Sequence, residues 1–322
     1  MPSYSGVWSL SQQFQAVGQG LWPPNFVADG TFGIFALGST AGGIVTTRNK
    51  YTYSGDAVSA GGAATAVSNI GSAAGNSTVG IFALGLTTSC VPLATRNKYT
   101  YVGCVVSTGG AATVGSYGGS AAGNSTVGIF ALGNNVTYNR VTTRDKYTYS
   151  GDAVSAGGAA TTASAYGSAA GNSTVGIFAL STTPGCVFVT TRNKYTYSGD
   201  VVSAGGAATT ISAYGSAAGN STVGIFALGF DGSLTRLTTR NKYTYSGCVV
   251  SAGGAATTAS ANGSAAGNST VGIFALGTTS GGRTTTRDRY TYSGCVVAAG
   301  GAATAASACG SAAGNGTIGV NT

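Results

Sequence analysis

A near-identical unit of about 48 residues recurs along most of this 322-residue chain. Each copy carries a Gly-Ile-Phe-Ala segment and then an Arg-Asn-Lys-Tyr-Thr-Tyr segment, with small substitutions. The arginines of the second segment give the spacing, which is 48 residues four times and then 47: Arg48, Arg96, Arg144, Arg192, Arg240 and Arg287. Repeats of this length bury their apolar residues by stacking on one another. The chain therefore predicts one repeat domain over residues 1–322, not two independent domains.

One unit divides into four predicted strands. "GSAA" at residues 71–74 is followed by a Gly-Asn turn and then by an apolar segment that suits a strand buried on both faces. "RNKYTY" alternates in polarity and predicts a more exposed third strand, and a segment of small residues after it predicts a fourth. A period in the forties with four strands is typical of an all-β propeller, in which each unit makes one blade. The alternative is a parallel β-helix, whose coils are usually shorter.

This strand order resembles kelch-like and related propeller repeats over residues 26–322. The sequence departs from the kelch pattern at two points. The doubled glycine that normally follows the second strand is missing, as in "ALGS" and "ALGN", and the fourth strand has no Trp. The propeller prediction therefore rests on period and strand order.

The two ends of the chain affect the expected blade count. Six full repeats cover residues 25–309, and residues 310–322 supply only the first two strands of a seventh. At the other end, "YSGVWSL" (Tyr4 to Leu10) matches "YSGDAVS" (Tyr53 to Ser59), where a third strand turns into a fourth. We expect seven blades, the last shared between the termini, because sharing removes an open sheet edge. Six blades, with residues 1–24 docked separately, is the alternative.

The composition argues against catalysis. The chain has no His and no Glu, which excludes a His-based triad, an ordinary zinc site and a Glu general acid. Most Asp residues fall at repeated turn positions such as Asp56, Asp152 and Asp200. The six Cys form no Cys-x-x-Cys pair. We predict no enzyme activity, no cofactor and no metal site.

The charge and the apolar runs bear on partners. The net charge of +8 comes mostly from one repeated position and not from a dense basic run, so nucleic acid is not an expected partner. Apolar runs such as "VGIFALG" are far shorter than the ~20 residues that a membrane span needs. "MPSYSGVWSL" lacks the basic start and apolar region of a signal peptide, so we expect synthesis in the cytoplasm of the producing cell.

The repeats diverge most at two places. The stretch after Ile-Phe-Ala-Leu differs in every copy, and the residue before the Gly that opens the next unit also varies. In an antiparallel blade these two loops emerge on the same face, and loops on a rigid scaffold often carry function. Unselected drift of the loops is the alternative. Aromatic and Arg side chains dominate binding hot spots. The candidate binding residues are Tyr117, Tyr138, Arg140, Tyr166, Phe188, Tyr214, Phe230, Arg236 and Arg283.

The third strand carries two basic residues per unit near the predicted variable face. Together they would form a basic ring there. Alternatively, each Arg bonds backbone or Asp between blades and each Lys is solvated; near-identical repetition favours this packing role for the Arg. The residues are Arg48, Lys50, Arg96, Lys98, Arg144, Lys146, Arg192, Lys194, Arg240, Lys242, Arg287 and Arg289.

The N-terminal stretch "SGVWSLSQQFQAVGQGLWPP" (Ser5 to Pro24) resembles the opening segment of tailed-phage virion proteins, through Trp8, Leu10, Gln13, Gln15, Ala16, Gly20, Trp22 and Pro23. The resemblance implies a non-enzymatic virion component on a tail fibre, the tail or the capsid, present as an oligomer within the particle. Its partners would be other virion proteins or a host cell-surface polysaccharide. The alternative is a free carbohydrate-binding propeller, a lectin. A lectin with one site per blade should repeat its binding residues, and these loops do not repeat.

Overall fold

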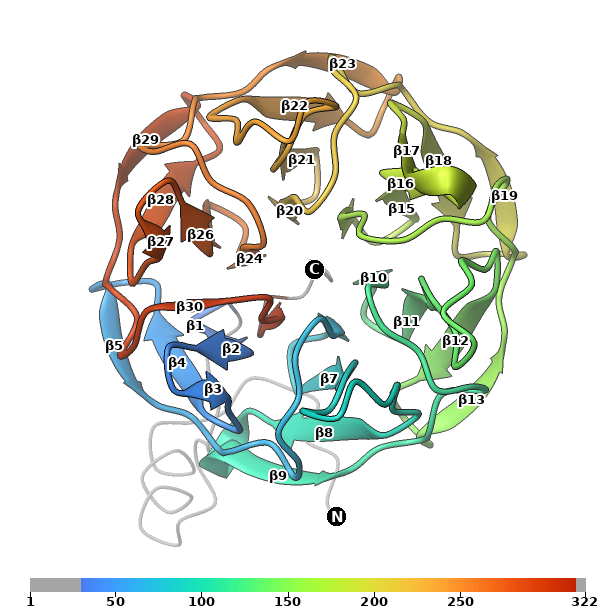
Figure 1. Cartoon of the computed structure of the whole chain (residues 1–322), viewed down its shortest axis with the longest axis horizontal. Coiled ribbons are helices and arrows are strands. Elements are labelled where there is room, and N and C mark those ends of the chain that lie inside the picture. The colour runs from blue at the N-terminus through green and yellow to red at the C-terminus, as the bar shows by residue number, and fades with distance from the viewer. Residues whose placement is uncertain (1–29, 317–322) are drawn as a thin grey trace, which may run out of the picture.

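The computed structural model describes residues 30–316, which form six four-stranded antiparallel sheets arranged as a ring (Figure 1). Each sheet is one blade, so the fold is a β-propeller. Helix is limited to two short 3-10 turns in the described part, η1 (Val102–Cys104) and η2 (Pro184–Cys186). No helix among residues 30–316 is long and apolar enough to cross a membrane.

We number the blades 1 to 6 along the chain and the strands of each blade from the ring axis outward. The first strands are β31 (Ala312–Gly314), β6 (Ser72–Gly75), β10 (Ser120–Gly123), β14 (Ala169–Gly171), β20 (Ser216–Gly219) and β24 (Ser264–Gly267). The second strands are β1 (Phe32–Ala36), β7 (Val79–Ala83), β11 (Val127–Ala131), β15 (Val175–Ala179), β21 (Val223–Ala227) and β25 (Val271–Ala275).

The two outer strands follow the same order of blades. The third strands are β4 (Arg48–Thr52), β8 (Arg96–Thr100), β12 (Arg144–Thr148), β18 (Arg192–Thr196), β22 (Arg240–Thr244) and β28 (Arg287–Thr291). The fourth strands are β5 (Ala57–Ala60), β9 (Val105–Thr108), β13 (Ala153–Ala156), β19 (Val201–Ala204), β23 (Val249–Ala252) and β29 (Val296–Ala299). Short loop strands complete the set: β2 (Ser39–Thr40), β3 (Gly43–Ile44), β16 (Thr182–Thr183), β17 (Val187–Phe188), β26 (Thr278–Thr279), β27 (Gly282–Arg283) and β30 (Ser307–Ala308).

The end of the described chain closes the ring. Strand β31 pairs antiparallel with β1, with Gly33 opposite Gly314 and Phe35 opposite Ala312. Blade 1 begins at a second strand, so its first strand comes from the far end of the sequence. We expected residues 310–322 to supply strands of a seventh blade shared with the N-terminus, but their described part instead completes blade 1, and residues 30–316 hold six four-stranded sheets. The proposed contribution of Tyr4 to Leu10 lies outside the described residues.

The core lies between blades. At the interface of blades 1 and 2, Phe32 and Ile34 pack against Phe82, Tyr99 and Tyr101. Small residues allow this approach, and they come from the first strands, where Ala73 and Ala74 are fully buried. The fourth strands, which also consist of small residues, form the mostly exposed outer edge. Because every blade presents the same two faces to its neighbours, the unit must repeat with little change.

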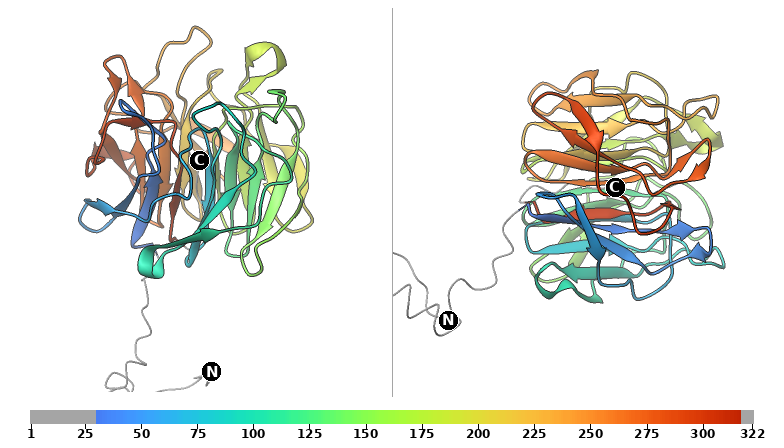
Figure 2. Two further views of the ribbon diagram at one scale, coloured as in Figure 1. Left: turned by 60° about the horizontal axis from the view of Figure 1, so that its bottom comes forward. Right: turned by 90° about the vertical axis from the view of Figure 1, so that its left-hand side faces the viewer.

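The two divergent loops of each blade lie on one face, the variable face. Isolated bridges join them: Tyr117 pairs with Asn134, and Ala213 pairs with Phe230. Figure 2 shows η2, in a divergent loop, at one end of the ring and η1, in a constant turn, at the other. On the opposite face the Asn76 side chain accepts hydrogen bonds from the N–H groups of Thr78 and Val79, each at 2.9 Å. The Gly-Asn turns thus have a structural role.

Candidate functional site

A closed circle of backbone hydrogen bonds surrounds the ring axis at the variable face. The circle is made by six residues, each of which stands immediately before the glycine that opens a unit. Each donates its N–H to the carbonyl of the equivalent residue in a neighbouring blade, over 2.6 to 2.9 Å. All six take a positive φ, between 54° and 65°. Their backbones are therefore alike, whereas their side chains are of five kinds: Ile70, Gly118, Tyr166, Tyr214, Asn262 and Cys309.

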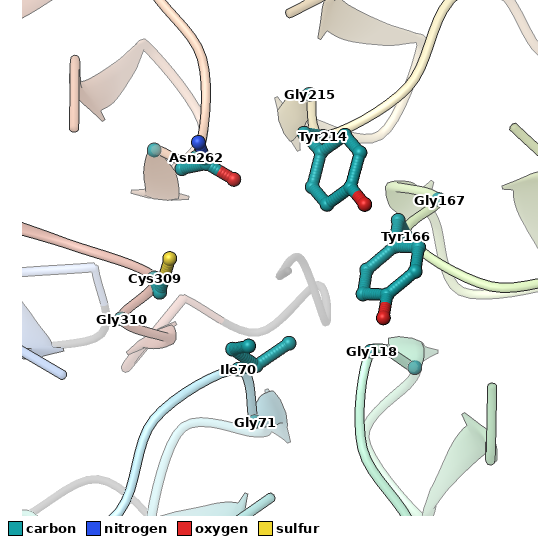
Figure 3. A pocket seen from close by; sticks show the side chains of 12 residues that line it. Ile70, Gly71, Gly118, Tyr166, Gly167, Tyr214, Gly215, Asn262, Cys309 and Gly310 are labelled. Atoms are coloured by element: carbon teal, nitrogen blue, oxygen red, sulfur yellow. The ribbon is translucent and has the colours of Figure 1, made fainter. Parts of the chain in front are cut away.

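The circle frames a cavity of about 60 Å³ (Figure 3). The rings of Tyr166 and Tyr214 stand side by side at its rim, with Ile70 and Cys309 across from them. The two tyrosine rings stack with centroids 4.5 Å apart and planes 24° apart. Gly118 makes room for them, because a Cβ there would lie 2.8 Å from a ring carbon of Tyr166. Chemically, one half of the rim is aromatic and the other half is not.

The stacked pair belongs to a larger group, the aromatic arc, which consists of Tyr138, Tyr117, Tyr166, Tyr214 and Phe230. Successive ring centroids along it are 6.0, 6.3, 4.5 and 6.0 Å apart. At its far end the guanidinium of Arg236 lies 5.1 Å from the Phe230 centroid, within the range of a cation–π contact. The arc draws on loops of blades 3, 4 and 5, so it exists only in the assembled ring.

Three other candidate residues lie outside the arc. Arg140 is next to it: its guanidinium donates to Thr182 Oγ1 at 3.4 Å and to Cys186 Sγ at 3.5 Å. Burial raises the pKa of Tyr166 and of Tyr214, and the charge of Arg140 opposes that rise. Arg283 is exposed in β27 and donates to Ser39 Oγ at 2.9 Å, away from the arc. Phe188, in β17, is half-buried.

The arginines of the expected basic ring are not on the surface. All six are at most 1% exposed and lie between blades. The guanidinium carbon of Arg48 lies 4.5 Å from the Phe82 centroid, and its Nη2 donates to Asn97 of the next blade at 3.0 Å. The arginines therefore have the packing role that their near-identical repetition favours. The expectation of an exposed arginine ring is wrong.

Three of the remaining members of that ring bind acids. Lys98 pairs with Asp152 at 2.9 Å, Lys146 with Asp200 at 3.0 Å and Arg289 with Asp56 at 2.6 Å, each across a blade interface. The acids belong to the turns between third and fourth strands, which hold Asp in three units and Cys in the other three. Lys50 Nζ lies 4.3 Å from the Phe32 centroid, and Lys194 and Lys242 are half-buried at the same strand position. The sequence did not predict the three ion pairs, because the acid of each pair lies in another repeat.

Comparison with known proteins supports the fold and gives no information about function. No protein-family model matches the sequence, and no curated protein matches it. The solved structure of YjhT is similar, with a TM-score of 0.63 over 86% of this chain and 99% of that chain. The likeness is one of fold. At 12% identity it supports the propeller architecture and carries nothing about ligands.

Proposed function

We propose that this chain is a non-catalytic adhesion protein that binds its target through the aromatic arc on the variable face. One observation supports this above the others: the loops that differ between repeats bring five aromatic side chains and Arg236 into one continuous group beside a cavity. Tyr138, at its outer end, is 56% exposed. Clustered aromatic and Arg side chains are typical of binding hot spots.

The target that best suits the arc is a host cell-surface polysaccharide. Tyrosine offers a flat apolar face and a hydroxyl group, which match the two kinds of surface on a sugar ring. The arc occupies one side of the ring, which favours a single composite site over the one-site-per-blade pattern of a multivalent lectin. The resemblance of Ser5 to Pro24 to tailed-phage proteins supports placing this site on a virion, and that segment lies outside the described residues.

Substitution of the exposed end of the arc and of the two arginines beside the arc tests the proposal. We expect the combined variant Tyr138→Ala, Arg140→Ala and Arg236→Ala to lose at least tenfold in affinity for purified host polysaccharide, with an unchanged melting temperature. Val249→Ser, on the exposed outer edge of blade 5, is the matched control and should bind normally. Normal binding by the triple variant would contradict the proposal. Mass spectrometry of purified particles tests the virion assignment separately, and absence of the chain from them would refute it.

A further inference from the structure

The six buried arginines fall into two groups, which differ in the chemical class of the side chain that the guanidinium binds. At two blade interfaces the partner is a carboxylate: Arg96 donates to Asp145 and Arg240 to Asp288, both at 2.7 Å. At the other four the partner is a neutral amide, at 3.0 to 3.1 Å. These pairs are Arg48 with Asn97, Arg144 with Asn193, Arg192 with Asn241 and Arg287 with Asn49.

The two kinds of interface are otherwise nearly the same. The N–H of Thr65 donates to Asn97 Oδ1, and that of Thr113 donates to Asp145 Oδ2, both at 3.0 Å. The Asn97 amide donates to Thr65 Oγ1, whereas the Thr113 hydroxyl donates to Asp145 Oδ1, both at 2.7 Å. The threonine hydroxyl changes from acceptor to donor and the geometry is kept. Only the negative charge differs between the two kinds.

Four guanidinium groups therefore lie buried without a neighbouring carboxylate. Burial lowers the pKa of Arg48, Arg144 and Arg192 to about 10, so each remains charged at neutral pH. The facing Phe ring offsets part of the desolvation. A buried charge without a partner of opposite sign is unfavourable. The Nε–H is buried with no hydrogen-bond partner in these three arginines, as it is in Arg96, Arg240 and Arg287, so the missing carboxylate is what sets the three apart from Arg96 and Arg240.

A small cavity lies beside each of the same three arginines. The cavities measure about 20 Å³ at Arg48 and about 10 Å³ at Arg144 and at Arg192. More than one serine lines each cavity, and the equivalent serine of the three is Ser68, Ser164 or Ser212; the described residues place no carboxylate on any of their walls. Space of this order admits one particle about the size of a water molecule.

We propose that the interfaces of Arg48, Arg144 and Arg192 each bind one small monovalent anion of the chloride class, held by the guanidinium and the neighbouring serine. The anion supplies the negative charge that Asp145 and Asp288 supply at Arg96 and Arg240. Halide binding would thus stabilise the ring, because the sites are completed only when two blades are packed together.

Bromide in crystals of the full chain locates the sites directly. We expect anomalous difference peaks beside Arg48, Arg144 and Arg192, and none beside Arg96 and Arg240, which serve as controls within the molecule. Water without an anomalous signal at all three positions would overturn the inference. Equal peaks at the two Asp interfaces would also overturn it, because the missing carboxylate would then not determine binding.

A pair of reciprocal variants tests the charge argument in solution. Asn97→Asp gives Arg48 the carboxylate that Arg96 already has, in a geometry that the fold accepts. It should remove the bromide peak at Arg48 and reduce the rise in melting temperature between sodium gluconate and sodium chloride of equal concentration. Asp145→Asn should do the reverse and add a peak at Arg96. If both variants keep the wild-type peaks and the wild-type response to chloride, the inference fails.

Discussion

At the scale of single residues, the repeat is maintained by close contacts that tolerate little change. The second strands carry a glycine that lies close to the hydroxyl of the tyrosine that ends the third-strand segment. A Cβ on Gly128 would lie 2.8 Å from Tyr149 Oη and 3.1 Å from Ala74 Cβ of the neighbouring blade. The glycine is thus required for blade packing, and not for any unusual backbone angle.

Gly128→Ala should therefore destabilise the ring by about 1–3 kcal/mol, the usual cost of overpacking a core. Thermal or urea unfolding measures the change. Gly151→Ala is the matched control, because a Cβ there meets nothing within 4 Å. Equal stability of the two variants would show that the blades can separate slightly at no cost.

Because the tyrosines of the third-strand segments are buried, we expect the folded ring to lose stability at alkaline pH. Burial raises the pKa of Tyr51 to about 12, and it raises the pKa of the fully buried Tyr53 and Tyr101 further above the usual value. In the unfolded chain these groups ionise near pH 10. Their contribution is complete below that pH and is lost as pH rises through the folded pKa values.

The six buried arginines act in the opposite sense over this range, because the folded state releases their protons first, but they are fewer than the tyrosines. We expect the melting temperature to fall above about pH 10. Tyrosinate absorbance should appear for the buried tyrosines only on unfolding. Ionisation of these groups in the folded ring at pH 10 would contradict their burial.

At the scale of strands, the sequence predicts much of the fold because each repeat shows its own four segments. The sequence does not predict the contacts that join two repeats. The third strand looks half-exposed, yet Arg48, Asn49 and Tyr51 are all buried, since neighbouring blades cover both faces of each sheet. The sequence predicts the residues of the aromatic arc as separate candidates on one face. Their order around the axis follows only from the folded ring.

Ring closure gives the prediction at this scale. Deleting residues 310–322 removes β31 and leaves the inner edge of β1 unpaired. Open edges favour aggregation, so we expect a large drop in melting temperature or insoluble protein. Circular dichroism and light scattering measure both effects. A truncated chain that melts like the full one would contradict closure by β31.

At the scale of the whole molecule, uniform packing is combined with a one-sided surface. The blade interfaces, the backbone circle and the opposite-face turns repeat around the axis, whereas the aromatic arc occupies only blades 3 to 5. A protein with equivalent sites would show the reverse arrangement, in which recognition residues repeat. The phage assignment and the relation to kelch repeats stay predictions, supported by sequence resemblance.

Hydroxyl-radical footprinting, with and without purified host polysaccharide, tests the central claim most directly. The oxidation of Tyr138, Tyr117, Tyr166 and Tyr214 should fall when the polysaccharide is added, while residues of the opposite-face turns keep their reactivity. Protection confined to the turns around Asn124 and Asn220, with the arc unprotected, would show that the working face is the other one.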